Sequence, residues 1–397
     1  MNTVTKRILC LTSALLFVLP SLGFAESAGQ VNAEVSAQLV NAPSAILIEP
    51  TSGQTLYELN ADERLPIASV TKTMTMLLIA EALDSGKIKP EDTVTTSEYA
   101  ASMGGSQVFL EVGEEMSADD MLKAIAVASG NDAAVAMAEF VAGTESAFVE
   151  MMNKRAAELG CTNTHFINCN GLNETADHYS SARDVARISA ELLRHPLITE
   201  YTSIWMDSLR GGSFGLSNTN KLIRFYKGAN GIKTGSTSTA KYCLSASAVR
   251  DGMQLIAVVL GAPSTADRFS SASRLLDYGF ANYSVVNAAE KIGELSAVPV
   301  IGGRDESVVP EPDKSVSFIV KKGNQDKIEV SVNFEEALRA PIAIGQKIGE
   351  AQLSIDGEVI AHCDIKSATE VRRMNFGTML LKFVTRWLCI DKIAEIG

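Results

Sequence analysis

The chain has 397 residues, 46% of them hydrophobic, and a formal net charge of −12. The length predicts at least two domains, and the hydrophobic content suffices for a sizeable core. An acidic protein repels the phosphate backbone, so nucleic acid is not an expected partner.

The first 25 residues have the layout of a secretory signal peptide. Lys6 and Arg7 precede an apolar run, and Gly23 and Ala25 are the small residues expected at positions −3 and −1 of a cleavage site. A retained membrane anchor is the alternative, which a proline and the shortness of the apolar run disfavour. We expect an exported protein.

The cysteines do not form a disulfide framework. The chain has six, which are scattered, and an odd number remains once the signal segment is removed. Cys161 and Cys169 could pair, but buried thiols are the favoured interpretation. No Cys-x-x-Cys or His-x-x-x-His pair suggests zinc, and we expect no metal or other cofactor.

Strand patterns lie at both ends of a first predicted domain, residues 30–290, with helical patterns between them. Apolar positions repeat every second residue in the former and at helical spacing in the latter. Expected strands cover residues 44–50, 55–60, 241–249 and 253–262; expected helices cover residues 69–86, 117–129, 132–143, 144–160, 181–196 and 266–283. The pattern predicts an α/β domain in which a helical block interrupts the strands of one sheet.

Residues 291–371 predict a small all-β domain. Short alternating runs are broken by Gly, Asp and Asn, which favours a β-sandwich over a barrel.

Residues 372–397 differ from both domains and predict a cationic amphipathic helix. Its apolar face carries Phe376, Leu380, Phe383, Trp387 and Ile390, and the opposite face carries Thr378, Lys382, Thr385, Arg386 and Lys392 after Arg372 and Arg373. This pattern is typical of a helix that lies in a membrane interface, and it holds too many charges to span a bilayer. A helix docked on its own domain and a dimer contact are the alternatives.

A serine and a lysine stand three residues apart where the first long helix begins. Ser69 and Lys72 would share one helix face. A serine hydroxyl needs a neighbouring base to act as a nucleophile. None of the four histidines lies in a triad-like motif. A lysine can be the base if burial and a second cation lower its pKa.

Two further short motifs follow, each weak by itself. Ser129-Gly130-Asn131 separates two helical periods, and Lys233-Thr234-Gly235 opens the first strand of the second hairpin. Ser-x-x-Lys, then Ser-x-Asn about 60 residues on, then Lys-Thr-Gly about 100 residues further form a specific set.

With this trio the chain resembles the low-molecular-weight penicillin-binding proteins, which are serine-type D-alanyl-D-alanine carboxypeptidases. The resemblance extends over nearly the whole chain. It implies a penicillin-binding transpeptidase-like domain (an antiparallel sheet with a helical block), a β domain and an anchoring helix. It also implies peptidoglycan stem peptides ending in D-Ala-D-Ala as substrates, β-lactams as inhibitors and the outer face of the cytoplasmic membrane as the location.

The same resemblance implies roles for the motif residues. Ser69 would be the nucleophile and Lys72 its base, with Lys233 as the second cation. Ser129 would relay a proton to the leaving amine, and Asn131 would hold the substrate amide.

The remaining implied roles concern the strand edge. Lys233, Thr234 and Arg268 would contact the substrate carboxylate. Gly235 would let the strand approach the substrate, and the N–H groups of Ser69 and Ser236 would form the oxyanion hole. His178 and Asp184 are expected to be structural, Asp184 through a cap or a pair with Arg183.

Three other functions remain open. The nearest is a D,D-endopeptidase of cross-linked peptidoglycan. A serine β-lactamase of class A would need Glu-x-x-Leu-Asn, but Cys169 stands three residues before Leu172. A non-catalytic cell-wall scaffold would be expected to have lost its nucleophile or base, and both are present.

Overall fold

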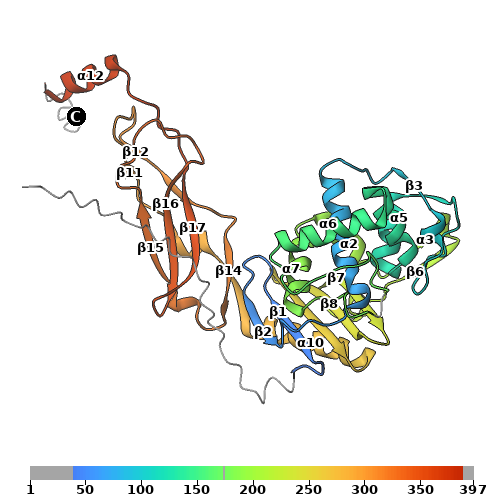
Figure 1. The fold of residues 1–397 in the computed structure, drawn as a ribbon. Coiled ribbons are helices and arrows are strands. Elements are labelled where there is room, and N and C mark those ends of the chain that lie inside the picture. The colour runs from blue at the N-terminus through green and yellow to red at the C-terminus, as the bar shows by residue number, and fades with distance from the viewer. Residues whose placement is uncertain (1–38, 173–174, 388–397) are drawn as a thin grey trace, which may run out of the picture.

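The computed structural model describes residues 39–172 and 175–387 (Figure 1). A larger α/β domain is followed by an elongated β domain, and helix α12 lies at the far end of the latter. The predicted signal peptide lies outside the described residues.

One antiparallel sheet of five strands, in the order β2-β1-β9-β8-β7, organises the larger domain. Strands from both ends of the domain meet in it; Ile46, for example, pairs with Val258. The predicted α/β architecture is thus confirmed. The strands are β1 (Ser44–Ile48), β2 (Thr55–Leu59), β7 (Ala229–Thr237), β8 (Lys241–Arg250) and β9 (Met253–Ala262).

One strand prediction was wrong. Lys233-Thr234-Gly235 does not open the first strand of the hairpin but lies in β7, a separate edge strand that pairs with β8. The turn between them, residues 238–240, contains neither glycine nor proline, so nothing in the sequence marked a break there.

Helices cover both faces of this sheet. Successive residues of β1 point to opposite sides: Ile46 joins the core that includes α2 and the helical block, and Leu47 joins the core that includes α10. The helices are η1 (Ala68–Thr71), α2 (Lys72–Asp84), α3 (Glu98–Ala101), α4 (Ala118–Lys123), η2 (Ala124–Ala128), α5 (Asn131–Ala142), α6 (Glu145–Glu158), α7 (Ala182–Leu192), α8 (Pro196–Thr202), η3 (Arg210–Gly212), α9 (Leu222–Phe225) and α10 (Thr265–Asn282).

Two small two-stranded sheets lie at the outer end of the helical block. They are formed by β3 (Thr93–Thr95) with β4 (Glu115–Ser117) and by β5 (Met206–Leu209) with β6 (Phe214–Ser217). Hydroxyl caps begin several helices, since Ser117, Thr144 and Ser181 each accept a backbone N–H from the first turn.

The β domain packs small sheets around one apolar core. Its four-stranded sheet has the order β13-β17-β16-β15, and β10 pairs with β14. Residues of both, such as Phe318 and Leu353, share the core. The elements are β10 (Tyr283–Asn287), α11 (Ala288–Ile292), β11 (Val298–Pro299), β12 (Ser307–Val308), β13 (Pro310–Pro312), β14 (Ser317–Lys321), η4 (Gln325–Lys327), β15 (Glu329–Phe334), β16 (Lys347–Ile355) and β17 (Glu358–Ser367).

Helix α12 (Phe376–Trp387) begins where Asn375 Oδ1 accepts the backbone N–H of Thr378. The apolar side chains between residues 376 and 384 are largely exposed, with Phe376 73% and Phe383 69% accessible. None of the helices that the structure describes combines the length and the apolar character needed to cross a bilayer.

Candidate active site

Ser69 and Lys72 lie on the turn that leads from η1 into α2. Ala68, the residue before the serine, has φ +49°, which is the left-handed region that a residue with a side chain rarely adopts. This bend presents Ser69 at the surface of the core, half-buried, while Lys72 is fully buried. The Nζ atom of Lys72 lies 3.1 Å from the Oγ atom of Ser69.

Lys72 has two more polar neighbours, and both are acceptors. The amine donates to Asn131 Oδ1 at 2.5 Å and to the backbone carbonyl of Asn170 at 2.8 Å. A neutral amine has two N–H groups and one lone pair. In the neutral form, N–H groups directed at these two acceptors would leave the lone pair for the hydroxyl of Ser69.

Burial also favours the neutral amine. It lowers the pKa of Lys72 to about 7, against the opposing charge of Asp132. A general base is most effective when its pKa is near the working pH. The sequence-based requirement that the lysine be buried is therefore met in the structure.

Ser129 stands at the end of η2, a single π-helical turn, and has φ +65°. Its side chain is buried, and its Oγ atom has no hydrogen-bond partner in the described part of the chain. An unpaired buried hydroxyl is costly, and such groups and π-helical turns are both frequent at functional sites.

Asn131 begins α5 and is held at both ends of its carboxamide. Its Nδ2 donates to the Gly104 carbonyl at 2.7 Å, and its Oδ1 accepts from Lys72. The predicted contact with a substrate amide stays a prediction, and in this structure Asn131 orients the lysine.

The edge strand β7 brings Lys-Thr-Gly against the serine turn. A Cβ atom on Gly235 would lie 2.6 Å from the Ile67 carbonyl oxygen and 2.9 Å from the backbone nitrogen of Ser69. Only glycine allows this approach. The glycine was predicted to let β7 lie close to the substrate, and in the structure it lets β7 lie close to the backbone of the nucleophile. Ser236 follows it and is exposed near the end of β7.

Lys233 and Thr234 precede this glycine and are both buried. Lys233 donates to the carbonyl of Thr234 at 3.0 Å, and Thr234 donates to the Oγ1 atom of Thr219 at 2.7 Å. Burial, and then the charges of Lys72 and Arg268, hold the pKa of Lys233 well below its usual range. The structure thus brings together the lysines that the sequence paired.

Arg268 on α10 contacts the backbone of strands β7 and β8. Its Nη1 donates to the carbonyls of Gly235 at 3.0 Å and Cys243 at 3.3 Å. Its guanidinium also lies over the rings of Tyr242 and Phe269. The predicted contact with a substrate carboxylate stays a prediction, and the contacts present here position β7.

Several residues hold the site through contacts that the sequence did not predict. His178 contributes a buried imidazole whose Nδ1 accepts from the backbone N–H of Ile167, so its Nε2 donates to Thr71 Oγ1 at 2.7 Å. Thr71 in turn donates to the carbonyl of Ala68 at 2.8 Å. Burial lowers the pKa of His178 to about 4, so it is neutral near pH 7. The structural role expected for it is thus a specific one, next to the nucleophile.

Two aspartates complete the frame. Asp132, buried beside Asn131, accepts the backbone N–H groups of Val108 and Leu110 and so fixes the loop that contacts Asn131. The expected pair of Asp184 with Arg183 is wrong: Asp184 pairs with Arg187, because its carboxylate points inward to the backbone N–H of Asn163. For both aspartates, the only indication in the sequence was a polar residue at the start of a predicted helix.

The four cysteines that the structure describes are free thiols. Cys161, Cys169, Cys243 and Cys363 are all buried and unpaired with one another, as favoured above. Burial raises the pKa of the Cys169 thiol well above its usual range, so it is protonated beside Lys72. Within residues 39–172 and 175–387, no group of three His, Cys, Asp or Glu side chains could hold a metal ion.

Comparison with known proteins identifies the family to which the chain belongs. The sequence model of the D-alanyl-D-alanine carboxypeptidase family matches residues 31–264. The sequence model of the penicillin-binding protein 5 C-terminal domain matches residues 280–373. The D-alanyl-D-alanine carboxypeptidase DacF of Bacillus subtilis is 44% identical over 388 residues, which covers 96% of this chain and 99% of the relative.

More distant relatives match over the same span. DacA of Escherichia coli is 33% identical and covers 97% of this chain and 98% of its own. The crystal structure of penicillin-binding protein 5 from Haemophilus influenzae superposes with a TM-score of 0.73 at 34% identity, covering 84% of this chain and 98% of that one. The chain therefore belongs to the D-alanyl-D-alanine carboxypeptidase family, peptidase family S11.

Proposed function

We propose that this protein is a serine-type D-Ala-D-Ala carboxypeptidase of peptidoglycan stem peptides, with Ser69 as nucleophile and Lys72 as base. One observation carries the assignment of roles: the Nζ atom of a buried lysine, whose pKa is lowered to about 7, lies 3.1 Å from the hydroxyl of a half-buried serine.

In the first step Ser69 Oγ attacks the carbonyl carbon of the penultimate D-alanine, and its proton passes to Lys72 Nζ. The new C–O bond produces a tetrahedral oxyanion. When the C–N bond to the terminal D-alanine breaks, the leaving nitrogen takes a proton from Lys72 through Ser129 Oγ. D-alanine leaves with a neutral amine, and the acyl group remains on Ser69 as an ester.

Two features of β7 support this step. The backbones of Gly235 and Ser69 lie close enough that a Cβ on the glycine would contact Ser69 N. The N–H groups of Ser69 and Ser236 would then stabilise the oxyanion, with each donor lowering the barrier by about 3–4 kcal/mol. Arg268, and Lys233 in its protonated form, would attract the terminal carboxylate of the substrate, and the hydroxyl of Thr234 would donate a hydrogen bond to it.

In the second step water attacks the ester, and Lys72, neutral again, accepts the proton from the water. The ester C–O bond breaks, the lysine returns the proton to Ser69 Oγ, and the shortened peptide leaves. β-Lactams would acylate the same serine, but their leaving nitrogen stays attached to the acyl group. We expect slow hydrolysis of that ester, since Cys169 stands where a class A β-lactamase needs a glutamate.

We further infer that the protein is exported and held on the outer face of the cytoplasmic membrane. The signal-like first 25 residues support export. The exposed apolar side chains of α12, together with Lys382 on the same helix, support a helix that lies in the membrane interface.

Release of D-alanine from an acyl-D-Ala-D-Ala tripeptide tests the activity. The chain without residues 1–25 should release D-alanine, and the S69A variant should not. Ser213→Ala, which removes an exposed hydroxyl on the same domain, is the matched control and should keep full activity. Labelling of Ser69 by a fluorescent penicillin without any D-alanine release would instead indicate a cross-linked stem peptide as substrate. The absence of both release and labelling would favour the scaffold.

Deletion of residues 372–397 tests the anchor. The truncated protein should stay active and no longer sediment with membranes. If it still sediments, α12 is not what holds it there.

A further inference from the structure

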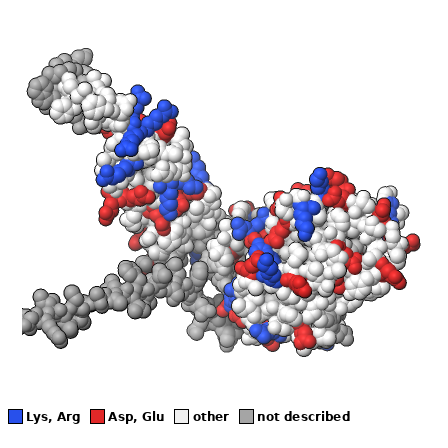
Figure 2. Space-filling model, turned by 45° about the horizontal axis from the view of Figure 1, so that its top comes forward, with Lys and Arg blue, Asp and Glu red and all other residues white. Residues whose placement is uncertain are grey.

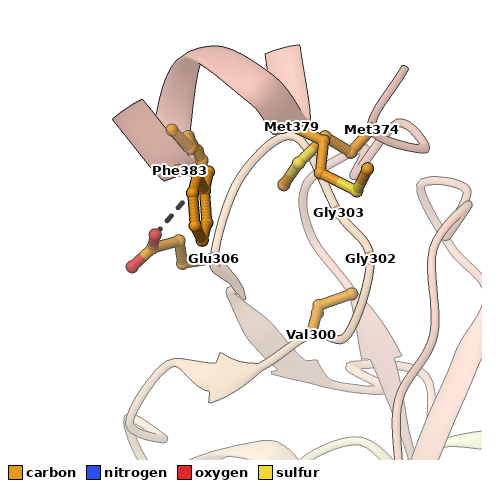
Figure 3. A pocket seen from close by; sticks show the side chains of 8 residues that line it. Val300, Gly302, Gly303, Glu306, Met374, Met379 and Phe383 are labelled. Atoms are coloured by element: carbon orange, nitrogen blue, oxygen red, sulfur yellow. Dashed lines mark hydrogen bonds and ion pairs between the residues drawn. The ribbon is translucent and has the colours of Figure 1, made fainter. Parts of the chain in front are cut away.

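A groove separates α12 from the end of the β domain. It has a volume of about 610 Å³ and is lined by Val300, Gly302, Gly303, Glu306, Met374, Met379, Lys382 and Phe383. In Figure 3, Phe383 and Met379 project from the helix side toward the loop that carries Gly302 and Gly303, and Val300 lies at the base. The walls are mainly apolar, and the groove lies at the opposite end of the molecule from the candidate active site (Figure 1).

Several arginines lie next to the groove's lining loop in the chain or pair with it through their backbone. Arg304 follows Gly303 in the lining loop, and its backbone N–H donates to the carbonyl of Arg372 at 2.7 Å. Arg373 pairs with Gly303 through an isolated β-bridge, and Arg339 pairs with Ile301. Figure 2 shows lysine and arginine side chains gathered over this end of the β domain, next to α12, although the protein as a whole has a net charge of −12.

Most of this positive charge is not neutralised locally. Arg372 pairs with Glu370, and Lys382 pairs with Glu306. Within the described ranges, Arg304, Arg339 and Arg373 form no ion pair. An apolar groove close to arginines that form no ion pair suits a ligand that has both a hydrocarbon chain and an anionic group.

The adjoining helix indicates where such a ligand would come from. Phe376, Leu381 and Phe383 of α12 are each more than 60% exposed, and an exposed apolar face of this size marks an interaction surface. A bilayer would cover that face and at the same time bring phospholipids to the groove.

We propose that the groove between α12 and the loop 300–306 binds one anionic phospholipid. An acyl chain would lie against Val300, Met379 and Phe383, and the phosphate would contact Arg304 and Arg373. This proposal rests on the membrane location inferred above and adds arginines of the β domain to the attraction for anionic lipids that the cationic helix already has. Glu306 faces the same groove, so its charge opposes the bound phosphate.

The test uses the chain that lacks residues 1–25. It measures how much of this protein sediments with vesicles of pure phosphatidylcholine and with vesicles that also contain phosphatidylglycerol. We expect tighter binding to the anionic vesicles. The double variant R304Q/R373Q should lose roughly thirtyfold in affinity for them, or about fivefold for each cation removed. It should bind neutral vesicles as the wild type does.

Two further variants make the result specific. K154Q/R194Q removes the same charge from exposed positions of the larger domain and should bind as the wild type does. Glu306→Gln should strengthen binding to anionic vesicles, because it removes the opposing carboxylate from the groove.

Several outcomes would overturn the proposal. One is equal binding of the wild type to both kinds of vesicle. Another is an equal loss in R304Q/R373Q and K154Q/R194Q, which would mean that only net charge matters. A third is a dimer in vesicle-free solution that Phe383→Ser dissociates, because a second copy would then occupy the groove. By contrast, failure of the wild type to bind any vesicle would refute the membrane location itself.

Discussion

The carboxamide oxygen of Asn131 lies 2.5 Å from the amine of Lys72, and Gly104 fixes which end of the carboxamide faces the lysine. The contact is neutral, which matters for the chemistry. A neutral acceptor orients an N–H of the amine without stabilising the charged form as strongly as a carboxylate would. Asn131 thus positions the base and leaves its pKa low.

The wild-type enzyme should therefore show an acylation rate that depends on Lys72. Because burial lowers its pKa to about 7, the neutral form dominates above that pH and the charged form below it. The rate of labelling by a fluorescent penicillin should be half-maximal near pH 7 and should fall about tenfold per unit at lower pH. Lys72→Arg, which stays charged, should lose the reaction. A flat profile from about pH 5 to 9 would contradict Lys72 as the base.

Asn131→Asp should move this profile to higher pH. A carboxylate beside the amine favours the charged lysine, and such a neighbour shifts a pKa by about 1–3 units. The variant should be slow at pH 7 and recover as the pH rises. Asn131→Leu removes the acceptor without adding charge, so it should lower the rate without an upward shift of the midpoint. Identical midpoints in Asn131→Asp and the wild type would contradict direct contact between the two side chains in solution.

His178 should position the nucleophile through Thr71. Removing a partner from a buried hydrogen bond costs about 1–3 kcal/mol, so His178→Ala should lower the free energy of unfolding by that amount. It should also lower kcat more than it raises KM, because Thr71 releases the carbonyl of the residue before Ser69. His178→Asn should restore part of kcat. His362→Gln, on the exposed surface of the β domain, is the control.

The same histidine should contribute to acid sensitivity. Its pKa is about 4 when folded and about 6.5 when unfolded. The unfolded state therefore binds the extra proton between these values, and stability falls as the pH falls from about 6.5 to 4. Replacing His178 with alanine should make the decline shallower, by at most about 1.4 kcal/mol per pH unit. An unchanged slope in a denaturation series would show that the imidazole is not buried in the neutral form.

How much of this site was predictable depends on how each contact arises. Ser69 and Lys72 are three residues apart, so helical geometry alone places them together. The five-stranded sheet was predictable in part, because strands with period two stand at both ends of the first domain. The caps at Ser117, Thr144 and Ser181 follow from residue type.

The other contacts had no sequence signal. Lys72 is held by the carbonyl of Asn170, and any residue supplies a carbonyl. Separation of Lys-Thr-Gly into its own strand depends on a turn without glycine or proline. The link from His178 to Thr71 joins residues 107 apart, and such a pairing follows from the packing of the whole domain.

Gly235 provides the sharpest test of the site geometry. In Gly235→Ala the new methyl group would lie within 3 Å of three backbone atoms, in Ile67, Ser69 and Val70. Backbone atoms cannot give way as a flexible side chain does, so β7 and the serine turn must separate. A shift of this size in a catalytic arrangement costs about a hundredfold in rate. We expect penicillin labelling to slow by that factor while the far-ultraviolet circular dichroism stays native.

Gly215→Ala is the matched control for this variant. Gly215 lies in β6, where an added Cβ atom would have no neighbour within 4 Å and the backbone has no positive φ, so the change should leave labelling as fast as in the wild type. If Gly235→Ala also labelled at the wild-type rate, the two backbones would not be in contact in solution. The N–H groups of Ser69 and Ser236 could then not act together on one oxyanion. A loss of rate in Gly235→Ala alone would support the close approach that the proposed acylation requires.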